Sequence, residues 1–411
     1  MAWREGLYPG YGLTAPQELK KQISTTTVSS VIFSLAAVFL LGVSKFPGSV
    51  MLLVLLLSFI LLPMSRALTK RFLLKTHLWG EPVLIIGASA LGQRIGQALR
   101  DSPLDGLHPV CFFDDDIAKS STSLCGLPIQ GKIIEAEEFA IKHGIHRAVI
   151  TLNNPTANSP SNIAKLKSPI FEKVQFIPDL PHLPVSGIQS GSLKDLLTLE
   201  VTNTLNFPIN QFIKRLLDLV GSTLGILLLS PLACLVGLVI YFESPGPIFY
   251  RSKRIGRNGK KISVWKFRTM VPGADHRLTT LLRENEDLRA EWLTNQKLQE
   301  DPRITNVGHI LRKTSFDELP QLWNVIIGEM SLVGPRPIVN DEIQKYGTAF
   351  KFYKMVRPGI TGHWQVSGRS ETSYTQRVEL DTFYVRNWSI WLDIHIIVKT
   401  FEVVLRRNGA Y

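Results

Sequence analysis

Two long apolar stretches near the start of the chain limit what it can fold into more than any other feature. Residues 28–46 and 50–64 are almost uncharged, and a short Lys-Phe-Pro-Gly turn separates them. Each is close to the shortest length that crosses roughly 30 Å of hydrocarbon as a helix. The pattern predicts a transmembrane helical hairpin, and a buried helical pair in a large soluble core is the alternative.

Basic residues flank this hairpin on both sides. They are, in chain order, Lys20, Lys21, Arg66, Lys70, Arg71 and Lys75. Lys and Arg beside membrane segments favour the cytoplasm, so we expect both ends of the hairpin there. The first twenty or so residues are polar and aromatic, and no cleavable signal peptide is expected.

The overall charge of +12 favours anionic partners, which include nucleic acid, acidic lipids and phosphorylated substrates. The three cysteines form no CxxC pair, so neither a disulfide framework nor a zinc site is indicated. A reducing, cytosolic location is therefore expected for the soluble parts.

Short apolar runs alternate with polar or helical segments after the hairpin, and this predicts a Rossmann-like α/β domain over 79–185, following an N-terminal region 1–78. The first turn, Gly87-Ala-Ser-Ala-Leu-Gly92, has Ser89 where the dinucleotide fingerprint needs its middle glycine. Since a serine keeps the backbone further from a pyrophosphate, we favour a structural or regulatory domain over one that binds NAD. Residues 186–208 are rich in Gly, Ser and Thr and are predicted to be a linker.

A third apolar segment, 216–242, is long enough to span a bilayer, but Ser230 and Pro231 interrupt it near the centre. Basic residues again flank both ends, namely Lys214, Arg215, Arg251, Lys253 and Arg254. If both basic clusters are cytoplasmic, the segment enters and leaves the membrane on one side as a re-entrant helix over about 212–242. A proline-kinked spanning helix is the alternative, and it would place the rest of the chain in the periplasm.

The chain after Tyr250 combines cations and acids in a way that indicates an anion-binding site. The fixed cations Lys266, Arg268, Arg312, Arg336 and Arg357 are of the kind that hold a diphosphate. The adjacent acids Asp317 and Glu318 precede an apolar segment, with Ser315 as a candidate helix N-cap. On the pattern alone, each cation is more simply a solvated surface charge, and the two acids more simply complement a helix dipole.

A series of strings changes that interpretation: FIKRLLD, the Ser-Pro break, KFRTM, TSFDELPQLWNV, MSLVGPRP, VRPGITG and LDTFYVRNWSIWLD. Taken in this order they resemble the bacterial sugar transferase family, the polyprenyl-phosphate hexose-1-phosphate transferases, over 212–411. The preceding hairpin and Rossmann-like domain resemble the large members of this family. The C-terminal segment is most similar to the undecaprenyl-phosphate galactose phosphotransferase branch.

The resemblance implies a membrane-anchored α/β enzyme of the bacterial inner membrane, with a cytoplasmic catalytic domain over 209–411 that includes the re-entrant helix. It implies Asp317 as the nucleophile, Glu318 as a ligand of Mg²⁺, and Arg312 as a further catalytic residue that holds phosphate. The substrate-binding residues would be Lys266, Arg268, Arg336 and Arg357. The substrates would be a UDP-hexose and undecaprenyl phosphate, and UMP would be released.

Several alternatives stay open. Galactose is the preferred hexose and glucose the second choice. A membrane-tethered nucleotide-sugar dehydratase or epimerase is disfavoured, because none of the nine tyrosines is followed four residues later by lysine. A non-catalytic membrane scaffold would not need the acidic pair, and no nucleic-acid partner is expected because the basic residues lie beside membrane segments.

The segment 275–300 is predicted to be an exposed helix, through which we also consider a homodimer. Large family members usually carry four or more N-terminal membrane helices, whereas this chain shows two.

Overall fold

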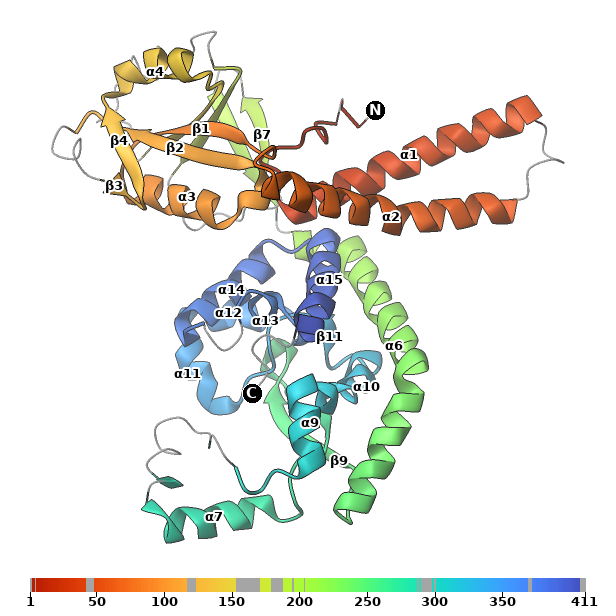
Figure 1. Ribbon diagram of the computed structural model, residues 1–411. Coiled ribbons are helices and arrows are strands. Elements are labelled where there is room, and N and C mark those ends of the chain that lie inside the picture. Colours follow the sequence, from red (N-terminus) through yellow and green to blue (C-terminus); the bar gives the residue numbers. More distant parts are fainter. Residues whose placement is uncertain are drawn as a thin grey trace. The chain divides into compact units, whose positions relative to one another are not determined.

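The computed structural model describes residues 2–3, 5–41, 48–116, 123–152, 171–178, 188–193, 196–202, 204–286, 288–289, 298, 301–368 and 372–406. The chain divides into two compact units, Met1–Leu183 and Pro184–Tyr411, which we describe separately (Figure 1). Both mix helices and strands. Within the described residues, three helices are long and apolar enough to cross a membrane, which indicates membrane association.

The first unit begins with the helical hairpin, formed by α1 (Ala15–Leu41) and α2 (Gly48–Lys75) (Figure 1). Both helices extend beyond the apolar stretches into their polar flanks. Glu18 of α1 accepts hydrogen bonds from Arg66 Nε and from Lys70 Nζ, the latter at 2.6 Å. Two of the flanking cations therefore hold the open end of the hairpin together, a role that their position in the sequence did not indicate.

A six-stranded sheet follows, in the order β3-β4-β2-β1-β5-β6, and all of its pairings are parallel except that of the edge strand β3. Alternate residues of β1 pack on opposite faces: Leu84 and Ile86 join Ala136 and Ala140 in one cluster, whereas Ile85 lies in another. Both faces are buried, as expected for parallel strands in an α/β domain. The elements are β1 (Glu81–Ile86), α3 (Ala90–Asp101), η2 (Pro103–Asp105), β2 (Leu107–Phe113), β3 (Ser123–Leu124), β4 (Leu127–Gly131), η4 (Ile133–Glu135), α4 (Ala136–His143), β5 (Arg147–Leu152) and β6 (Lys173–Pro178).

The predicted linker 186–208 contains regular structure that we did not expect. Strands β7 (Ile188–Leu193) and β8 (Leu196–Val201) pair as an antiparallel hairpin, and a short 3-10 helix η5 (Thr204–Asn206) follows. The alternation Leu-Thr-Leu-Glu-Val in β8 is a strand pattern. The small polar residues around it had suggested a linker.

Helix α6 (Pro208–Glu243) runs along one side of the second unit (Figure 1). We expected Ser230 and Pro231 to separate two helices, but the structure has one helix with the proline inside it. Pro231 has no N–H to donate to the carbonyl of Leu227, four residues earlier. The hydroxyl of Ser230 donates to that carbonyl instead, at 3.1 Å. The serine thus compensates for the bond that the proline removes.

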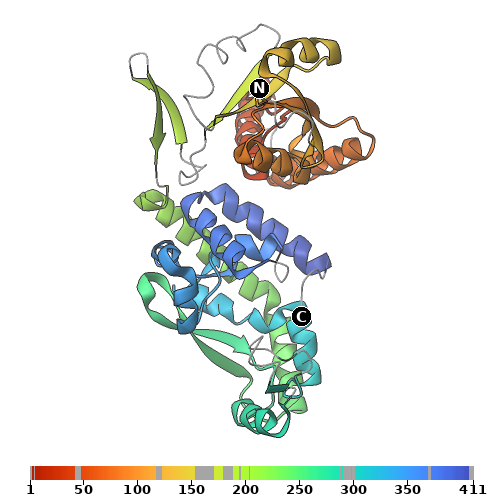
Figure 2. The ribbon, with the colours of Figure 1, turned by 90° about the vertical axis from the view of Figure 1, so that its left-hand side faces the viewer.

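Small sheets and short helices make up the rest of the second unit (Figure 2). Strands β9 and β10 pair in an antiparallel hairpin, and β11 and β12 pair in parallel. The elements are β9 (Phe249–Ile255), η6 (Arg257–Gly259), β10 (Lys261–Phe267), α7 (Ala274–Glu284), α9 (Asn306–Thr314), η7 (Phe316–Glu318), α10 (Gln321–Ile326), β11 (Ser331–Val333), η8 (Asn340–Glu342), α11 (Ile343–Tyr346), η9 (Gly347–Ala349), α12 (Phe350–Tyr353), β12 (Gly359–Thr361), α13 (His363–Val366), α14 (Tyr374–Arg386) and α15 (Ile390–Arg406). Helix α7 covers the start of the predicted insert 275–300, most of whose remainder lies outside the described residues.

A buried ion pair ties α6 to the carboxyl-terminal helices. Lys214 Nζ lies 2.7 Å from Asp393 Oδ2 and donates to the carbonyl of Val333 at 3.0 Å. Asp393 also accepts from the Tyr384 hydroxyl at 2.7 Å and from Trp388 Nε1 at 3.1 Å. These contacts place the lysine of FIKRLLD and the last aspartate of the closing string in one network, which supports the wall of the cavity described next.

Candidate active site

A cavity of about 1720 Å³ lies within the second unit. One part of its wall is charged and comes from β10, α9 and η7. Another part is apolar and comes from α6 and α15, with Leu216, Leu224, Leu228, Ile397 and Phe401 among its side chains. The cavity therefore joins a polar region to a long apolar surface, a combination that suits an amphipathic ligand.

The acidic pair reaches this cavity because helix α9 ends abruptly before it. Ser315 takes a left-handed conformation with φ of 59° and ends α9, after which η7 carries Asp317 and Glu318. Ser315 is the N-cap residue of η7, as predicted, but it makes no side-chain cap bond, and the N-cap residue of α10 is Pro320. The acids lie in the first turn of η7, which directly precedes α10.

Lys266 of β10 lies against both acids. Its Nζ is 2.7 Å from Glu318 Oε1 and 3.3 Å from Asp317 Oδ2. Burial raises the pKa of Asp317, and the charge of Lys266 and, more weakly, that of Arg312 act in the opposite direction. The pair is thus a partly buried anionic centre held by cations.

Arg312 and Arg268 line the same cavity from neighbouring elements. Arg312 lies in the last turn of α9, and its Nε donates to Thr269 Oγ1 at 3.0 Å; burial lowers its pKa. Arg268 is buried, and its Nη2 donates to the carbonyl of Ser244 at the end of α6. Both guanidinium groups are therefore oriented by bonds to the protein.

The other predicted residues separate in space. Arg336 lines the cavity and is exposed. Arg357 is not among the lining residues, and its Nε donates to the carbonyl of Gly328 at 2.8 Å. Ser230 and Pro231 lie further along α6, outside the lining. The structure thus brings together Lys266, Arg268, Arg312, Asp317, Glu318 and Arg336.

Sequence reasoning missed several lining residues. Arg254 of β9 and Trp364 of α13 both line the cavity, and the guanidinium carbon of Arg336 lies 5.9 Å from the centre of the Trp364 ring. The string GHWQVSGR directly follows VRPGIT, and its position beside a recognised motif was the signal that could have found Trp364.

Two adjacent glycines explain why the MSLVGPRP and VRPGITG strings occur together. A Cβ atom on Gly359 would lie 2.1 Å from the backbone nitrogen of Gly334. Only glycine permits the two backbones to approach so closely. This contact fixes the segment that ends in Arg336 against β12.

The acidic pair has the right donors for Mg²⁺ when a substrate is present. The described residues contain no cluster of three or more His, Cys, Asp and Glu side chains that could hold a metal alone. Mg²⁺, however, commonly takes one or two carboxylates and completes its shell with substrate phosphates and water. Asp317 and Glu318 fit such a site.

In the described part of the first unit, polar groups at the turn between β1 and α3 bond to the chain itself. The backbone N–H of Ala88 donates to Asp114 Oδ2 at 2.6 Å, and Ser89 Oγ accepts from the N–H of Gly92 at 3.3 Å. These are the groups at the start of α3 that would face a bound diphosphate. The chain's own side chains therefore occupy two N–H groups at this turn, which disfavours a diphosphate-bearing cofactor here.

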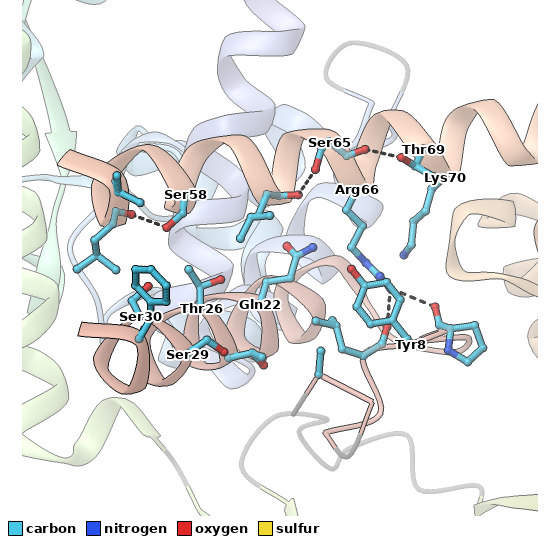
Figure 3. A pocket seen from close by; sticks show the side chains of 18 of the residues that line it. Tyr8, Gln22, Thr26, Ser29, Ser30, Ser58, Ser65, Arg66, Thr69 and Lys70 are labelled. Carbon is cyan, nitrogen blue, oxygen red and sulfur yellow. Dashed lines mark hydrogen bonds between the residues drawn. The ribbon is translucent and has the colours of Figure 1, made fainter. Parts of the chain in front are cut away.

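A second cavity, of about 820 Å³, lies between α1, α2 and the N-terminal segment (Figure 3). Hydroxyls of Ser58, Ser65 and Thr69 donate to carbonyls of α2 itself. Its cations, Arg66 and Lys70, are paired with Glu18. The polar groups named here are used within the hairpin, so we assign this cavity no chemistry.

Two family models match the chain. One, described as "Bacterial sugar transferase", matches residues 209–407 and includes every residue that lines the larger cavity. The other, described as "CoA-binding domain", matches residues 5–158. The contacts of Asp114 argue against a bound diphosphate cofactor in this second region.

Curated relatives are similar over most of the chain. The UDP-galactose-lipid carrier transferase of Erwinia amylovora is 38% identical over 399 residues, covering 96% of this chain and 82% of that protein. The undecaprenyl-phosphate galactose phosphotransferase of Salmonella typhimurium is 36% identical over 395 residues, covering 95% of this chain and 82% of that protein. The UDP-glucose:undecaprenyl-phosphate glucose-1-phosphate transferase of Escherichia coli is 32% identical over 340 residues, covering 80% of this chain and 68% of that protein.

Proposed function

The chain belongs to the bacterial sugar transferase family and is a phosphoglycosyl transferase, and we propose that it transfers galactose 1-phosphate from UDP-galactose to undecaprenyl phosphate with release of UMP. The transfer of a hexose 1-phosphate to this lipid, for polysaccharide synthesis, follows from the relatives. Galactose is preferred because the Erwinia amylovora and Salmonella typhimurium relatives, which match 96% and 95% of this chain against 80% for the Escherichia coli relative, have galactose in their names. Glucose is the alternative, because the Escherichia coli relative uses UDP-glucose.

One observation carries this proposal: a single cavity joins the acidic pair and its cations to the apolar faces of α6 and α15. A lipid phosphate has the same two parts, a charged head and a long apolar chain. Several fixed cations at one end of the cavity suit two phosphorylated substrates, because guanidinium groups bind phosphate oxygens in pairs.

We place Asp317 as the nucleophile. A carboxylate oxygen of Asp317 attacks the sugar-bearing phosphorus of the UDP-sugar, the bond from that phosphorus to the bridging oxygen breaks, and UMP leaves. An oxygen of undecaprenyl phosphate then attacks the same phosphorus and displaces the carboxylate of Asp317. The products are UMP and undecaprenyl diphosphate hexose, and the carboxylate is regenerated.

The other residues hold and neutralise the phosphates. Glu318, with Asp317 beside it, would hold Mg²⁺, which neutralises charge on the diphosphate when bound. Arg312 and Arg336 would bind phosphate oxygens at the cavity wall, and Lys266 keeps the two acids close together. Phosphoryl transfer depends chiefly on this alignment and neutralisation.

The test of function is UMP release by the purified full chain with undecaprenyl phosphate, Mg²⁺ and, in turn, UDP-galactose, UDP-glucose and UDP-N-acetylgalactosamine. Asp317→Asn should lower the rate by at least about 10³-fold, because it removes the nucleophile. Glu318→Gln should lower it strongly as well, whereas Glu379→Gln, at an exposed position of α14, should not. Equal rates for Asp317→Asn and the parent would overturn the proposal.

The covalent intermediate has its own test. With a donor labelled in the sugar and no lipid phosphate present, label should remain on the denatured parent protein and be absent from Asp317→Asn. Addition of undecaprenyl phosphate should remove it from the parent. Label that never appears on a fully active parent would indicate direct transfer between the two substrates.

We further propose that α6 is re-entrant and that the second unit is cytoplasmic, at the bacterial inner membrane. Support comes from the basic residues at both ends of α6. Cysteines at Phe207 and Lys253, in a chain whose own cysteines are replaced by serine, should react with an impermeant reagent from the same side of the membrane. Reaction from opposite sides would indicate a spanning helix.

A further inference from the structure

Two arginines from distant parts of the second unit meet at the carboxyl end of α10. Arg215 of α6 donates through Nη1 to the carbonyl of Val325 at 2.7 Å and through Nη2 to that of Ile326 at 2.8 Å. Arg357 donates through Nε to the carbonyl of Gly328 at 2.8 Å. Arg215 binds the last two carbonyls of α10, where cations are favoured, and Arg357 binds a carbonyl just beyond the end of that helix.

A third arginine, Arg257 of η6, lies near this pair. The backbone N–H of Asn258 donates to the carbonyl of Lys354 at 2.9 Å, which places η6 beside the segment leading to Arg357. Arg257 Nε is buried and has no hydrogen-bond partner in the part of the chain that the structure describes. Backbone carbonyls at and just beyond the end of α10 account for Arg215 and Arg357, but they leave this buried donor unexplained.

Among the described residues, the charges that act on Arg357 are those of two arginines and one carboxylate. Burial lowers the pKa of Arg357, and repulsion from Arg215 and then from Arg257 lowers it further. The carboxylate that acts against this repulsion is Asp218, whose Oδ1 already accepts from Ser331 Oγ at 2.9 Å and from the N–H of Leu332 at 3.0 Å. An external anion would relieve the repulsion and satisfy the buried donor of Arg257.

Exposed apolar side chains lie on α6 and at α10, the two helices that Arg215 joins. Trp323 of α10 is 52% exposed and Ile327, beside the carbonyl bound by Arg215, is 49% exposed. Phe212 is 64% exposed and lies one helical turn before Arg215 on α6. A cationic centre with an aromatic and aliphatic rim is typical of a surface that contacts lipid headgroups and the upper part of their chains.

We propose that Arg215, Arg257 and Arg357 bind the phosphate headgroup of an anionic phospholipid, at a site separate from the active site. None of the three lines the catalytic cavity. The site therefore does not depend on the proposed reaction, and its ligand is recognised by two features, a phosphate group and adjacent apolar chains. Free phosphate shares only the first feature.

The experiment measures thermal unfolding of the full chain in a neutral detergent, followed by tryptophan fluorescence. Short-chain phosphatidylglycerol, short-chain phosphatidylcholine and inorganic phosphate are titrated separately into the parent, Arg257→Gln and Lys253→Gln. Lys253 is an exposed cation on β9 and serves as the matched control for a lost charge. Phosphatidylglycerol should raise the unfolding temperature of the parent and of Lys253→Gln at the same concentrations.

In Arg257→Gln, the concentration of phosphatidylglycerol that gives half of this rise should increase about tenfold or more, the effect of losing one charge-assisted hydrogen bond. Without lipid, Arg257→Gln should unfold no lower than the parent, because the buried Nε has no partner to lose. Arg257→Lys keeps the charge and loses the planar fork, so its half-effect concentration of phosphatidylglycerol should lie between those of the parent and Arg257→Gln.

Equal half-effect concentrations for the parent and Arg257→Gln would overturn the proposal, as would an equal response to phosphatidylcholine. A response to inorganic phosphate as large as that to phosphatidylglycerol would show that the site takes free anions and would reject the lipid. A low unfolding temperature for both Arg257 variants in the absence of any ligand would assign Arg257 a structural role instead.

Discussion

Lys266 Nζ donates to Glu318 Oε1 at 2.7 Å, which joins strand β10 to the 3-10 helix that carries the acidic pair. The same ammonium group is 3.3 Å from Asp317 Oδ2. Adjacent carboxylates repel each other, so this lysine stabilises an arrangement that would otherwise be unfavourable.

The Lys266–Glu318 contact predicts coupling in a double-mutant cycle. Lys266→Gln and Glu318→Gln should each lower the free energy of unfolding, but together they should lower it by less than the sum, with a coupling of about 1 kcal/mol. The value is modest because both side chains are partly exposed. Unfolding of the four proteins by denaturant measures the cycle, and strictly additive effects would contradict the contact.

The buried pair of Lys214 and Asp393 predicts a larger effect on stability. Lys214→Met should destabilise the chain by about 3 kcal/mol, because it leaves a buried carboxylate without its cation. Lys253→Met, at an exposed site, should be close to neutral. Thermal unfolding in detergent compares the variants. Adding Asp393→Leu to Lys214→Met should recover part of the lost stability. If no stability is recovered, the lysine does not act by neutralising Asp393.

Asp381 of α14 predicts a pH dependence of stability. Burial raises the pKa of its carboxyl from 3.8 to about 7, and Tyr346 donates to it at 2.6 Å. Between these pH values the folded state holds a proton that the unfolded state releases, so the free energy of unfolding falls as the pH rises.

Asp381→Asn should remove this contribution. From about pH 5 to about pH 8, the free energy of unfolding of the variant should rise by about 2 kcal/mol relative to that of the parent. Denaturant unfolding at both pH values measures this change. Glu379→Gln, at an exposed position of the same helix, serves as the control. A parent and an Asp381→Asn variant with parallel pH profiles would show that Asp381 does not titrate in this range.

The contact between Ala88 and Asp114 predicts that the Rossmann-like domain does not respond to diphosphate cofactors. Titration with NADH or coenzyme A should leave the unfolding temperature of the parent unchanged, because Asp114 already accepts the N–H of Ala88 in the turn before α3. Asp114→Ala should lower stability by about 1 kcal/mol through loss of this bond, and Glu138→Gln, exposed on α4, should not. Saturable binding of either cofactor by the parent would contradict the prediction.

Local properties of the sequence were enough to predict the main elements. The hairpin follows from the length of two apolar stretches, and the α/β domain follows from short apolar runs separated by helical segments. Both signals come from neighbouring residues, and the hydrophobic effect acts on them in any fold. The antiparallel pair β7 and β8 was missed because glycine and serine in the same stretch indicated a linker.

The candidate site illustrates what sequence patterns do not contain. All five predicted cations look alike in the sequence, yet the structure brings Lys266, Arg268, Arg312 and Arg336 to the cavity and places Arg357 at the end of α10. Likewise, Asp317 and Glu318 lie before α10 because Ser315 adopts a left-handed conformation, which no residue type in that string demands.

The sequence by itself determined the membrane-associated, mixed α/β character of this protein and, through its motifs, the family to which it belongs. Only the tertiary structure decided which charges meet. Lys266 and Asp317 are 51 positions apart, and Lys214 and Asp393 are 179 positions apart. Electrostatic interactions depend on distance in space and on burial, and both are set by packing between elements that are remote along the chain.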